Sequence, residues 1–196
     1  MKPAVFIDRD GTLNEEVGYL DRLDRLALYP WSIDAVRLLN RSGYAVVVVT
    51  NQAGVARGFF DEGFVHEVHR HMADKLAGGG ARIDRYYYCP HHPAATVAAY
   101  RRECDCRKPR PGMIRRAEQE LDLDLRRSFV IGDRWLDIGL ANAVGATGVL
   151  VKTGYGAEEA LRPPPDASAA AVVGNLMEAV GWILRRIADF RFQISD

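Results

Sequence analysis

Acidic side chains follow apolar runs at two places in the chain. Asp8 and Asp10 come directly after the apolar run at residues 4–7, and Asp133 follows the run at residues 128–131. In an extended segment, residues two apart point the same way, so Asp8 and Asp10 can face one site. Two close carboxylates repel each other unless a proton or a cation lies between them. With Asp133, they would form an oxygen-rich site that suits Mg²⁺.

Other side chains suited to phosphate chemistry occur along the same chain. Thr50, a hydroxyl donor, follows the apolar run at residues 44–49, and Lys108 offers a point charge just before a predicted helix. Such groups are typical of phosphoryl transfer, in which one carboxylate attacks phosphorus, a second moves protons and cations neutralise the charge. Taken alone, residues 8–12 could equally form a turn with solvated acids. The complete set favours a phosphatase site.

All three cysteines of the chain lie in one short segment, as Cys89-x-His91 and Cys104-x-Cys106. Three thiolates and one imidazole make a closed tetrahedral ligand set, which is the structural class of zinc site. We therefore expect Zn²⁺ to stabilise the loop at residues 89–106, which has little apolar content of its own. Free thiols beside unrelated histidines are the alternative interpretation.

The other histidines are weaker candidates for metal binding. His92 is a second choice for the fourth zinc ligand. His66, His69 and His71 lie on one predicted helix. We expect these three at the surface or at the rim of a site rather than as ligands.

The pattern of the chain predicts an α/β protein. Strands are expected at residues 4–7, 44–49, 83–88, 128–131 and 148–151, alternating with helices at residues 32–42, 61–76, 111–121 and 136–144. A flap is expected at residues 14–29, after the first strand, and a loop at residues 153–168, after the last strand. A C-terminal helix is expected at residues 175–190, with the apolar stripe Leu176, Val180, Ile183, Leu184 and Ile187. The alternation predicts a doubly wound, Rossmann-like parallel sheet with helices on both faces. Ligands bind such sheets at the carboxyl ends of the strands, where Asp8, Thr50 and Asp133 lie.

Length and charge narrow the function classes further. With 196 residues, we expect one domain spanning residues 1–196. The formal net charge is zero, which disfavours non-specific binding to nucleic acid or to anionic membranes. No run of about 18 apolar residues occurs, and acidic residues within the first ten positions disfavour a signal peptide. We therefore expect a cytoplasmic, monomeric protein without a membrane or nucleic-acid partner.

Four segments resemble the signature motifs of the haloacid dehalogenase superfamily of phosphatases: DRDGT, VVTNQ, RKP and IGDRWLD. The resemblance covers the chain from Val5 to about Thr153. It implies that Asp8 is the nucleophile, that Asp10 is the general acid and base, and that Thr50 and Lys108 hold the phosphoryl group.

The same resemblance implies a magnesium site. Its ligands would be the carboxylates of Asp8 and Asp133 and the backbone carbonyl of Asp10. Asp137 would support this site without binding the ion.

The C-x-H…C-x-C loop, the RKPRPGM segment after it and the TNQAGVARG segment are similar to those of heptose-1,7-bisphosphate 7-phosphatases. Histidinol-phosphate phosphatase domains share the zinc loop. The resemblance implies Mg²⁺-dependent removal of the 7-phosphate of a heptose bisphosphate, in the synthesis of nucleotide-activated heptose for lipopolysaccharide, capsule or another surface glycan. The substrate-binding residues that it implies are Glu16, Val17, Gly18, Tyr19, Thr50, Asn51, Gln52, Ala53, Arg107, Lys108 and Arg134.

The short distance between the first two motifs leaves no room for a large cap domain, so the zinc loop and the flap must cover the site. A small cap suits a small sugar phosphate, and Arg107 could hold a second phosphate bidentately.

Histidinol phosphate is the alternative substrate. A nucleic-acid-end phosphatase is disfavoured by the absence of a basic stripe interleaved with aromatic residues. A non-catalytic zinc-stabilised binding module is disfavoured because both acids of DRDGT are present. Trp31 and Trp135 depart from the family pattern and leave the rim of the pocket, and the preferred anomer, open.

Overall fold

The computed structural model describes residues 1–165 and 167–194. Its strands are β1 (Ala4–Ile7), β2 (Ala45–Asn51), β3 (Arg85–Cys89), β4 (Phe129–Gly132), β5 (Thr147–Val151) and β6 (Ala171–Val173). Its α-helices are α1 (Ser32–Arg41), α2 (Ala53–Arg57), α3 (Glu62–Gly78), α4 (Gly112–Leu121), α5 (Trp135–Val144), α6 (Gly156–Leu161) and α7 (Leu176–Ile194). Short 3₁₀ turns occur at η1 (Leu23–Arg25), η2 (Ala98–Tyr100) and η3 (Leu125–Arg127).

The six strands form one parallel sheet in the order β3-β2-β1-β4-β5-β6. The strand order reverses at β1, which pairs with β2 on one side and with β4 on the other. Val5 is aligned with Val46 of β2 and with Phe129 of β4. The predicted doubly wound parallel sheet is therefore confirmed. Ligands bind such sheets at the carboxyl ends of the strands beside this reversal point.

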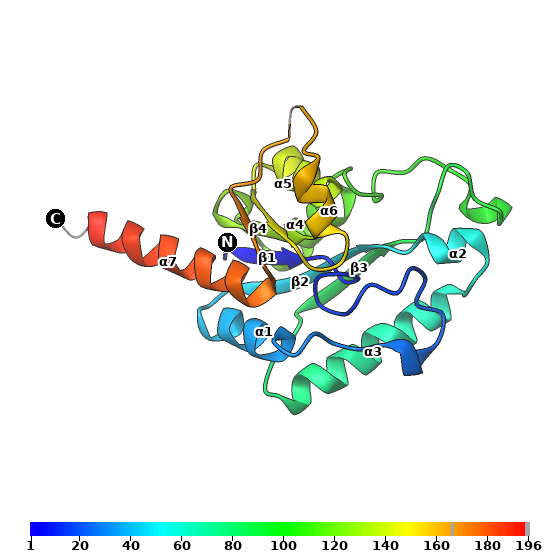
Figure 1. Cartoon of the computed structure of the whole chain (residues 1–196), viewed down its shortest axis with the longest axis horizontal. Coiled ribbons are helices and arrows are strands. Elements are labelled where there is room, and N and C mark those ends of the chain that lie inside the picture. The colour runs from blue at the N-terminus through cyan, green and yellow to red at the C-terminus, as the bar shows by residue number, and fades with distance from the viewer. Residues whose placement is uncertain (166, 195–196) are drawn as a thin grey trace.

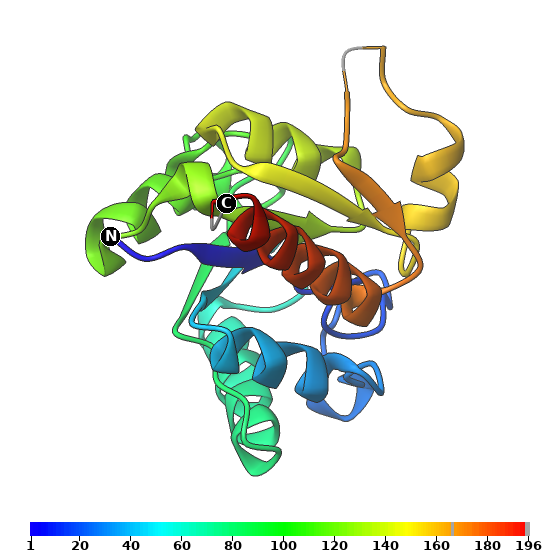
Figure 2. The same ribbon diagram turned by 90° about the vertical axis from the view of Figure 1, so that its left-hand side faces the viewer.

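Helices cover both faces of the sheet (Figures 1 and 2). α1, α3 and α7 cover one face, where Val5, Ile7 and Val48 point, and α4 and α5 cover the other, where Phe6 and Val47 point. All of these strand side chains are completely buried. Because both faces are covered, β1 and β2 are continuous apolar runs instead of alternating ones.

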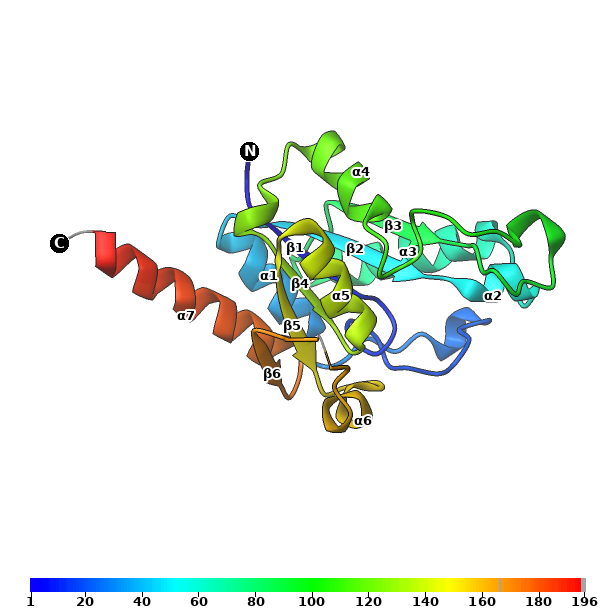
Figure 3. The same cartoon turned by 90° about the horizontal axis from the view of Figure 1, so that it is seen from above.

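The C-terminal helix packs against α1, β5 and β6 near its start and then runs away from the sheet (Figures 1 and 3). Its stripe residues Leu176, Val180 and Ile183 are completely buried, and Leu184 packs against the same core. The helix extends from Leu176 to Ile194, beyond the predicted end at residue 190. The side chain of Ile187 lies outside the described residues.

Besides the 3₁₀ turns, two short helices and one short strand were not predicted. α2 and β6 fall in segments that the sequence analysis leaves unassigned, and α6 lies inside the predicted loop at residues 153–168. Each is six residues long or shorter, so none shows a repeating apolar pattern. These elements depend on tertiary contacts for their stability.

The described connections around the reversal point contain no separate domain. The flap, η1 and α1 fill the segment between β1 and β2, and a long irregular loop follows β3. Within residues 1–165 and 167–194, no separate cap domain is inserted, in agreement with the sequence analysis. No helix in this part of the chain combines the length and the apolar character that crossing a bilayer requires.

Candidate active site and metal cluster

The side chains that we expect to do chemistry meet in one cavity of about 330 Å³ beside the carboxyl ends of β1, β2 and β4. The predicted site residues that line it are Asp8, Asp10, Glu16, Gly18, Tyr19, Thr50, Asn51, Gln52, Ala53, Arg107, Lys108, Asp133 and Arg134. Val17 does not line the cavity, since its side chain packs against the apolar core. The volume is at the small end of the usual range for small-molecule sites, about 300–1,000 Å³.

The ammonium group of Lys108 lies between two carboxylates, and the lysine side chain is 1% exposed. Nζ is 2.7 Å from Oδ1 of Asp8 and 2.7 Å from Oδ1 of Asp137, and it donates to the Val49 carbonyl at 3.0 Å. Burial alone would lower the pKa of Lys108, but Asp137 and Asp8 outweigh it and raise that pKa. A fixed positive charge therefore lies beside Asp8, where it can neutralise a phosphoryl group.

Asn51 fixes the backbone that carries this lysine. Its side-chain oxygen accepts the Lys108 N–H at 3.0 Å, and its side-chain nitrogen donates to the Lys108 carbonyl at 3.3 Å. Asn51 ends β2, so the pair of hydrogen bonds joins the sheet to the segment that follows the cysteine loop. The backbone of Lys108 is thereby aligned with the strand end.

Asp133 follows β4 and lies against glycine backbone. A Cβ atom at Gly11 or Gly154 would overlap Oδ2 of Asp133, and both glycines have positive φ angles, +79° and +55°. Oδ2 accepts the Tyr155 N–H at 2.8 Å, whereas Oδ1 is buried without a hydrogen-bond partner. Burial, followed by the charge of Asp8, raises the pKa of Asp133. The carboxylate thus has an oxygen available and a preference for a nearby cation.

The acidic cluster fits a divalent cation. Asp8, Asp133 and Asp137 are all buried, and their candidate ligand atoms lie within 4.8 Å of one another. Lys108 contributes one positive charge against these three carboxylates, so negative charge remains. Hard oxygen ligands with excess negative charge are what Mg²⁺ requires.

Asp10 is held by a network of hydrogen bonds. Arg9 reaches both carboxylate oxygens, at 2.9 Å for Oδ1 and 2.7 Å for Oδ2, and Asn14 donates to Oδ1 at 3.0 Å. Gln52 donates to Oδ2 at 2.9 Å and lies 2.9 Å from the hydroxyl oxygen of Thr50. Burial, the largest effect, raises the pKa of Asp10, but Arg9, Asn14 and Gln52 together outweigh it and lower that pKa. The sequence analysis does not assign Arg9, although its place between the two acids is a signal.

The flap enters the cavity through Glu16, Gly18 and Tyr19. Gly18 has a φ of +78° and donates its N–H to Glu16 Oε1 at 2.5 Å. Arg25 stabilises the flap, because its guanidinium donates to the carbonyls of Tyr19 and Val17 at 3.2 and 3.1 Å. These bonds fold the flap onto itself beside Asp8.

Arg134 and the two tryptophans that depart from the family pattern lie at different places. Arg134 lines the cavity, and its Cζ atom is 5.0 Å from the ring centre of Tyr155. Trp135 points elsewhere, since its indole donates to the Glu159 carbonyl at 2.7 Å. Trp31 stacks on Tyr29 and packs against the core. Neither tryptophan lines the cavity.

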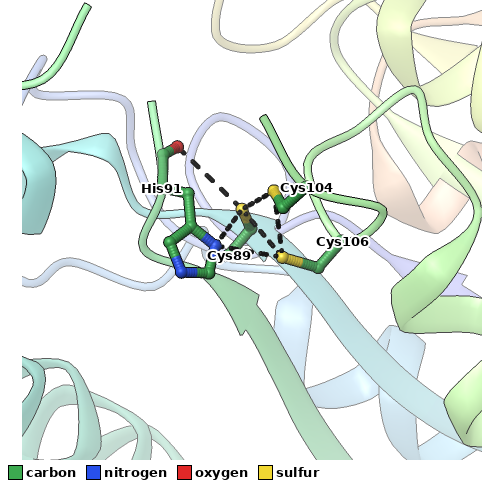
Figure 4. Close-up of side chains that lie close together, drawn as sticks. All are labelled: Cys89, His91, Cys104 and Cys106. Carbon is green, nitrogen blue, oxygen red and sulfur yellow. Dashed lines mark hydrogen bonds between the residues drawn. The ribbon is translucent and has the colours of Figure 1, made fainter. Parts of the chain in front are cut away.

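The predicted zinc ligands Cys89, His91, Cys104 and Cys106 meet at the end of β3, with ligand atoms within 4.8 Å of one another (Figure 4). The three sulfur–sulfur distances are 3.5, 3.2 and 3.3 Å, and His91 Nδ1 lies 3.4 Å from Cys106 Sγ. A tetrahedral site with Zn–S bonds of about 2.3 Å has sulfur atoms about 3.8 Å apart, so this cluster needs little expansion to hold Zn²⁺. The hydrogen bond between Cys106 and Cys89, the largest effect, lowers the pKa of the Cys106 thiol, which favours the thiolate form that binds metal.

The remaining histidines divide between surface, core and cavity. His66 and His71 are exposed on α3, as expected. His69 is only 6% exposed and stacks on Tyr86, so its predicted place at the surface or rim was wrong. Its position four residues after the buried Val65 puts it on the inner side of the helix. His92 lines the cavity and is not in the sulfur cluster.

Several residues that line the cavity were missed by the sequence analysis. Arg57 and Phe60 come from α2 and the turn after it, and Tyr155 follows β5. The segment ARG at residues 56–58 carried a basic side chain just after the TNQ motif, which was a usable signal for Arg57. Nothing in the local pattern pointed to Phe60 or Tyr155.

Comparison with known proteins places the chain in a family. A model of HAD-hydrolase-like proteins matches residues 105–179. The D-glycero-beta-D-manno-heptose-1,7-bisphosphate 7-phosphatase of Photorhabdus laumondii is 48% identical over 153 residues, which are 78% of this chain and 81% of that protein. The enzyme of the same name from Salmonella typhi is 40% identical over 188 residues, 95% of this chain and 92% of that protein.

Solved structures show the same relationship. The D,D-heptose 1,7-bisphosphate phosphatase from B. bronchiseptica, complexed with magnesium and phosphate, has a TM-score of 0.83 at 31% identity, over 95% of this chain and 99% of that one. The D,D-heptose 1,7-bisphosphate phosphatase from Burkholderia thailandensis has a TM-score of 0.63 at 28% identity, over 93% and 99% of the two chains. The chain therefore belongs to the haloacid dehalogenase-like hydrolases that cleave phosphate monoesters, and within them to the family of D-glycero-beta-D-manno-heptose-1,7-bisphosphate 7-phosphatases.

Proposed function

We propose that this phosphatase removes the 7-phosphate of D-glycero-β-D-manno-heptose 1,7-bisphosphate through a phosphorylated Asp8. The observation that carries the proposal is the contact between Asp8 and the buried ammonium of Lys108, in a cavity that also contains the unpaired oxygen of Asp133. The β-anomer is favoured because the relatives at 40–48% identity are named for it. A monomeric, cytoplasmic enzyme without a nucleic-acid or membrane partner stays a prediction.

Asp8 acts as the nucleophile. Its Oδ1 accepts the Arg9 N–H at 2.7 Å and the Lys108 ammonium at 2.7 Å, which orients the carboxylate. An oxygen of Asp8 forms a bond to phosphorus as the bond from phosphorus to the sugar oxygen breaks. Lys108 and Thr50 hold the phosphoryl oxygens during this step.

Asp10 moves the protons. It gives a proton to the departing sugar oxygen and then takes one from the water that attacks the phosphorylated Asp8. The second step releases inorganic phosphate and restores both carboxylates. Gln52 donates to both Asp10 and Thr50, so it fixes the position of the proton donor relative to the hydroxyl that binds the phosphoryl group.

The two metal sites have separate tasks. Asp8, Asp133 and the Asp10 carbonyl would hold Mg²⁺, which supplies charge neutralisation for the phosphoryl oxygens. Cys89, His91, Cys104 and Cys106 would hold Zn²⁺ in a closed set that leaves no position for a substrate. The zinc site instead fixes the loop, and Cys106 is only two residues before Lys108.

A substrate panel tests the proposal. Purified protein with Mg²⁺ is assayed on the β- and α-anomers of the heptose bisphosphate, on histidinol phosphate and on a simple aryl phosphate. We expect the highest kcat/KM for the β-anomer and a product that keeps its anomeric phosphate, as seen by phosphorus NMR. Preferential loss of the anomeric phosphate would contradict the proposed orientation. A higher kcat/KM for histidinol phosphate would replace the proposed substrate with that alternative.

A further inference from the structure

The flap contacts the end of α2 through two exposed aromatic rings. Tyr19 lines the cavity and is 38% exposed, whereas Phe59 follows α2, lies outside the cavity lining and is 54% exposed. Their ring centres are 4.6 Å apart and their planes are inclined by 63°, which is an edge-to-face arrangement. The contact therefore joins the flap to α2, two parts of the chain that both line the cavity (Figures 1 and 3).

The position of Phe59 is fixed by its own segment. Gly58 ends α2 with a φ of +75°, and the Phe59 N–H donates to the Gly54 carbonyl at 3.0 Å. The next ring, that of Phe60, lies on Gly54, where a Cβ atom would overlap it, and contacts Phe64 with ring centres 5.5 Å apart. Phe60 thus anchors the turn, while the more exposed Phe59 meets the flap.

The contact can break and form again during turnover. Arg57 strengthens it, because its Cζ atom lies 5.9 Å from the ring centre of Tyr19. Aromatic and cation–π contacts between partly exposed side chains are individually weak. The flap can therefore separate from α2 when a substrate enters and return to it when the substrate is bound.

The end of the flap should move as one unit with Tyr19. Arg25 donates to the carbonyls of Tyr19 and Val17 at 3.2 and 3.1 Å, and the Gly18 N–H donates to Glu16. Glu16 and Gly18 line the cavity together with Tyr19. A contact that holds the ring of Tyr19 therefore also fixes the other flap groups that face the cavity.

We propose that Phe59 is a positioning residue for the phosphatase reaction. Its ring holds Tyr19, and with it the turn at residues 16–19, over a bound sugar phosphate, although Phe59 does not touch the reacting atoms. The inference goes beyond the proposed function, because it applies to any substrate that extends from Asp8 to the flap. A small aryl phosphate, which occupies only the reacting end beside Asp8 and Lys108, gains little from it.

The kinetic test compares the heptose 1,7-bisphosphate with a simple aryl phosphate. In Phe59→Ala, kcat/KM for the heptose substrate should fall roughly 3- to 10-fold through a higher KM, as expected for the loss of an aromatic pair, and kcat/KM for the aryl phosphate should stay unchanged. Phe59→Tyr keeps the ring and should keep the wild-type values. Leu38→Ala removes a partly exposed apolar side chain of α1 outside the cavity and is the matched control. Equal losses on both substrates would overturn the positioning role.

Hydrogen–deuterium exchange tests the contact without any substrate. Peptides from residues 14–22 should exchange at least about 3-fold faster in Phe59→Ala than in wild type or Leu38→Ala, with exchange in the sheet unchanged. Unchanged exchange in these peptides would overturn the proposal, and so would faster exchange with a wild-type KM. If the wild type does not hydrolyse the heptose bisphosphate, the proposed function fails, and the same comparison with histidinol phosphate then decides the role of Phe59.

Discussion

Arg9 and Asp10 are neighbours in sequence and form a bidentate ion pair inside the protein. The guanidinium reaches both carboxylate oxygens, at 2.9 and 2.7 Å, and the side chain of Arg9 is 2% exposed while that of Asp10 is 20% exposed. A buried arginine beside the proposed proton donor has a cost, because that donor must hold a proton during turnover. The arginine therefore serves to orient Asp10 rather than to favour its protonated form.

Arg9→Met should lower both activity and stability. It removes the main partner of Asp10, so kcat should fall at least about 10-fold on every phosphate ester, with little change in KM. Breaking a buried pair should also lower the free energy of unfolding by about 3 kcal/mol. Steady-state kinetics and urea unfolding measure the two effects. Arg9→Lys keeps the charge without the bidentate geometry. Its kcat and its free energy of unfolding should lie between those of wild type and those of Arg9→Met. A folded Arg9→Met protein with wild-type kcat would contradict the orienting role.

Asp8→Asn should abolish turnover and leave the fold intact. The change is nearly isosteric, but the amide neither attacks phosphorus nor serves as an anionic metal ligand. Circular dichroism and gel filtration check the fold, and phosphate release checks the rate. A purified variant that keeps more than about a tenth of the wild-type rate, a barrier change below about 1.4 kcal/mol, would rule out a phosphorylated Asp8.

The purified protein should contain about one zinc ion per chain. Cys104→Ser should lose this zinc and lower the melting temperature by at least about 5 °C, because the loop at residues 89–106 then lacks its metal. Activity should still need added Mg²⁺, since the two ions occupy different sites. Elemental analysis and thermal unfolding measure both effects.

Two histidine variants provide the control for the zinc prediction. His91→Ala should lose zinc, whereas His92→Ala should keep it, because only His91 lies in the sulfur cluster. Native protein without zinc, and with three freely reacting thiols, would refute the structural metal site.

His69 should make the protein less stable in mild acid. Burial, followed by the charge of Arg9, lowers its pKa from 6.5 to about 3. Between these two values the unfolded chain binds a proton that the folded protein does not. The contribution of neutral His69 to the free energy of unfolding is therefore complete above pH 6.5. It is lost as the pH falls, by about 1.4 kcal/mol per pH unit.

Urea unfolding at pH 7 and pH 5 tests this difference. His69→Phe keeps a ring against Tyr86 and should reduce the loss of stability between the two pH values by about 2 kcal/mol relative to wild type. His71→Phe, at an exposed position on the same helix, is the matched control and should behave as wild type. Equal pH dependence in all three proteins would show that His69 takes up its proton without unfolding.

The sequence predicts the sheet and the reacting end of the site because their signals are local. Val46–Val49 form a continuous β-branched run that Thr50 directly follows, and Asp8 and Asp133 come after two other mainly apolar runs. The parallel arrangement then brings the strand ends together without further information. The four residues of the Cys/His cluster were equally visible, because pairs of soft ligands with a spacing of one residue are rare by chance.

The distal end of the site was harder to predict because it depends on contacts between distant segments. Arg57 reaches the cavity through α2, a five-residue helix whose end pairs with Val97 in the cysteine loop. No periodicity reveals so short a helix, and no local pattern reveals that pairing. The burial of His69 was missed for a different reason, because a histidine on the flank of an apolar stripe has no fixed preference for burial or for exposure.

The short spacing between Cys106 and Lys108 also restricts how this family can change during evolution. One side chain belongs to the sulfur cluster and the other is the buried ammonium beside Asp8, with only Arg107 between them. An insertion or deletion in this segment would move the lysine away from Asp8 or move the cysteine out of the cluster. Loop-length variation should therefore accumulate elsewhere, between the two Cys/His pairs of the cluster, while the Cys-Arg-Lys spacing stays constant.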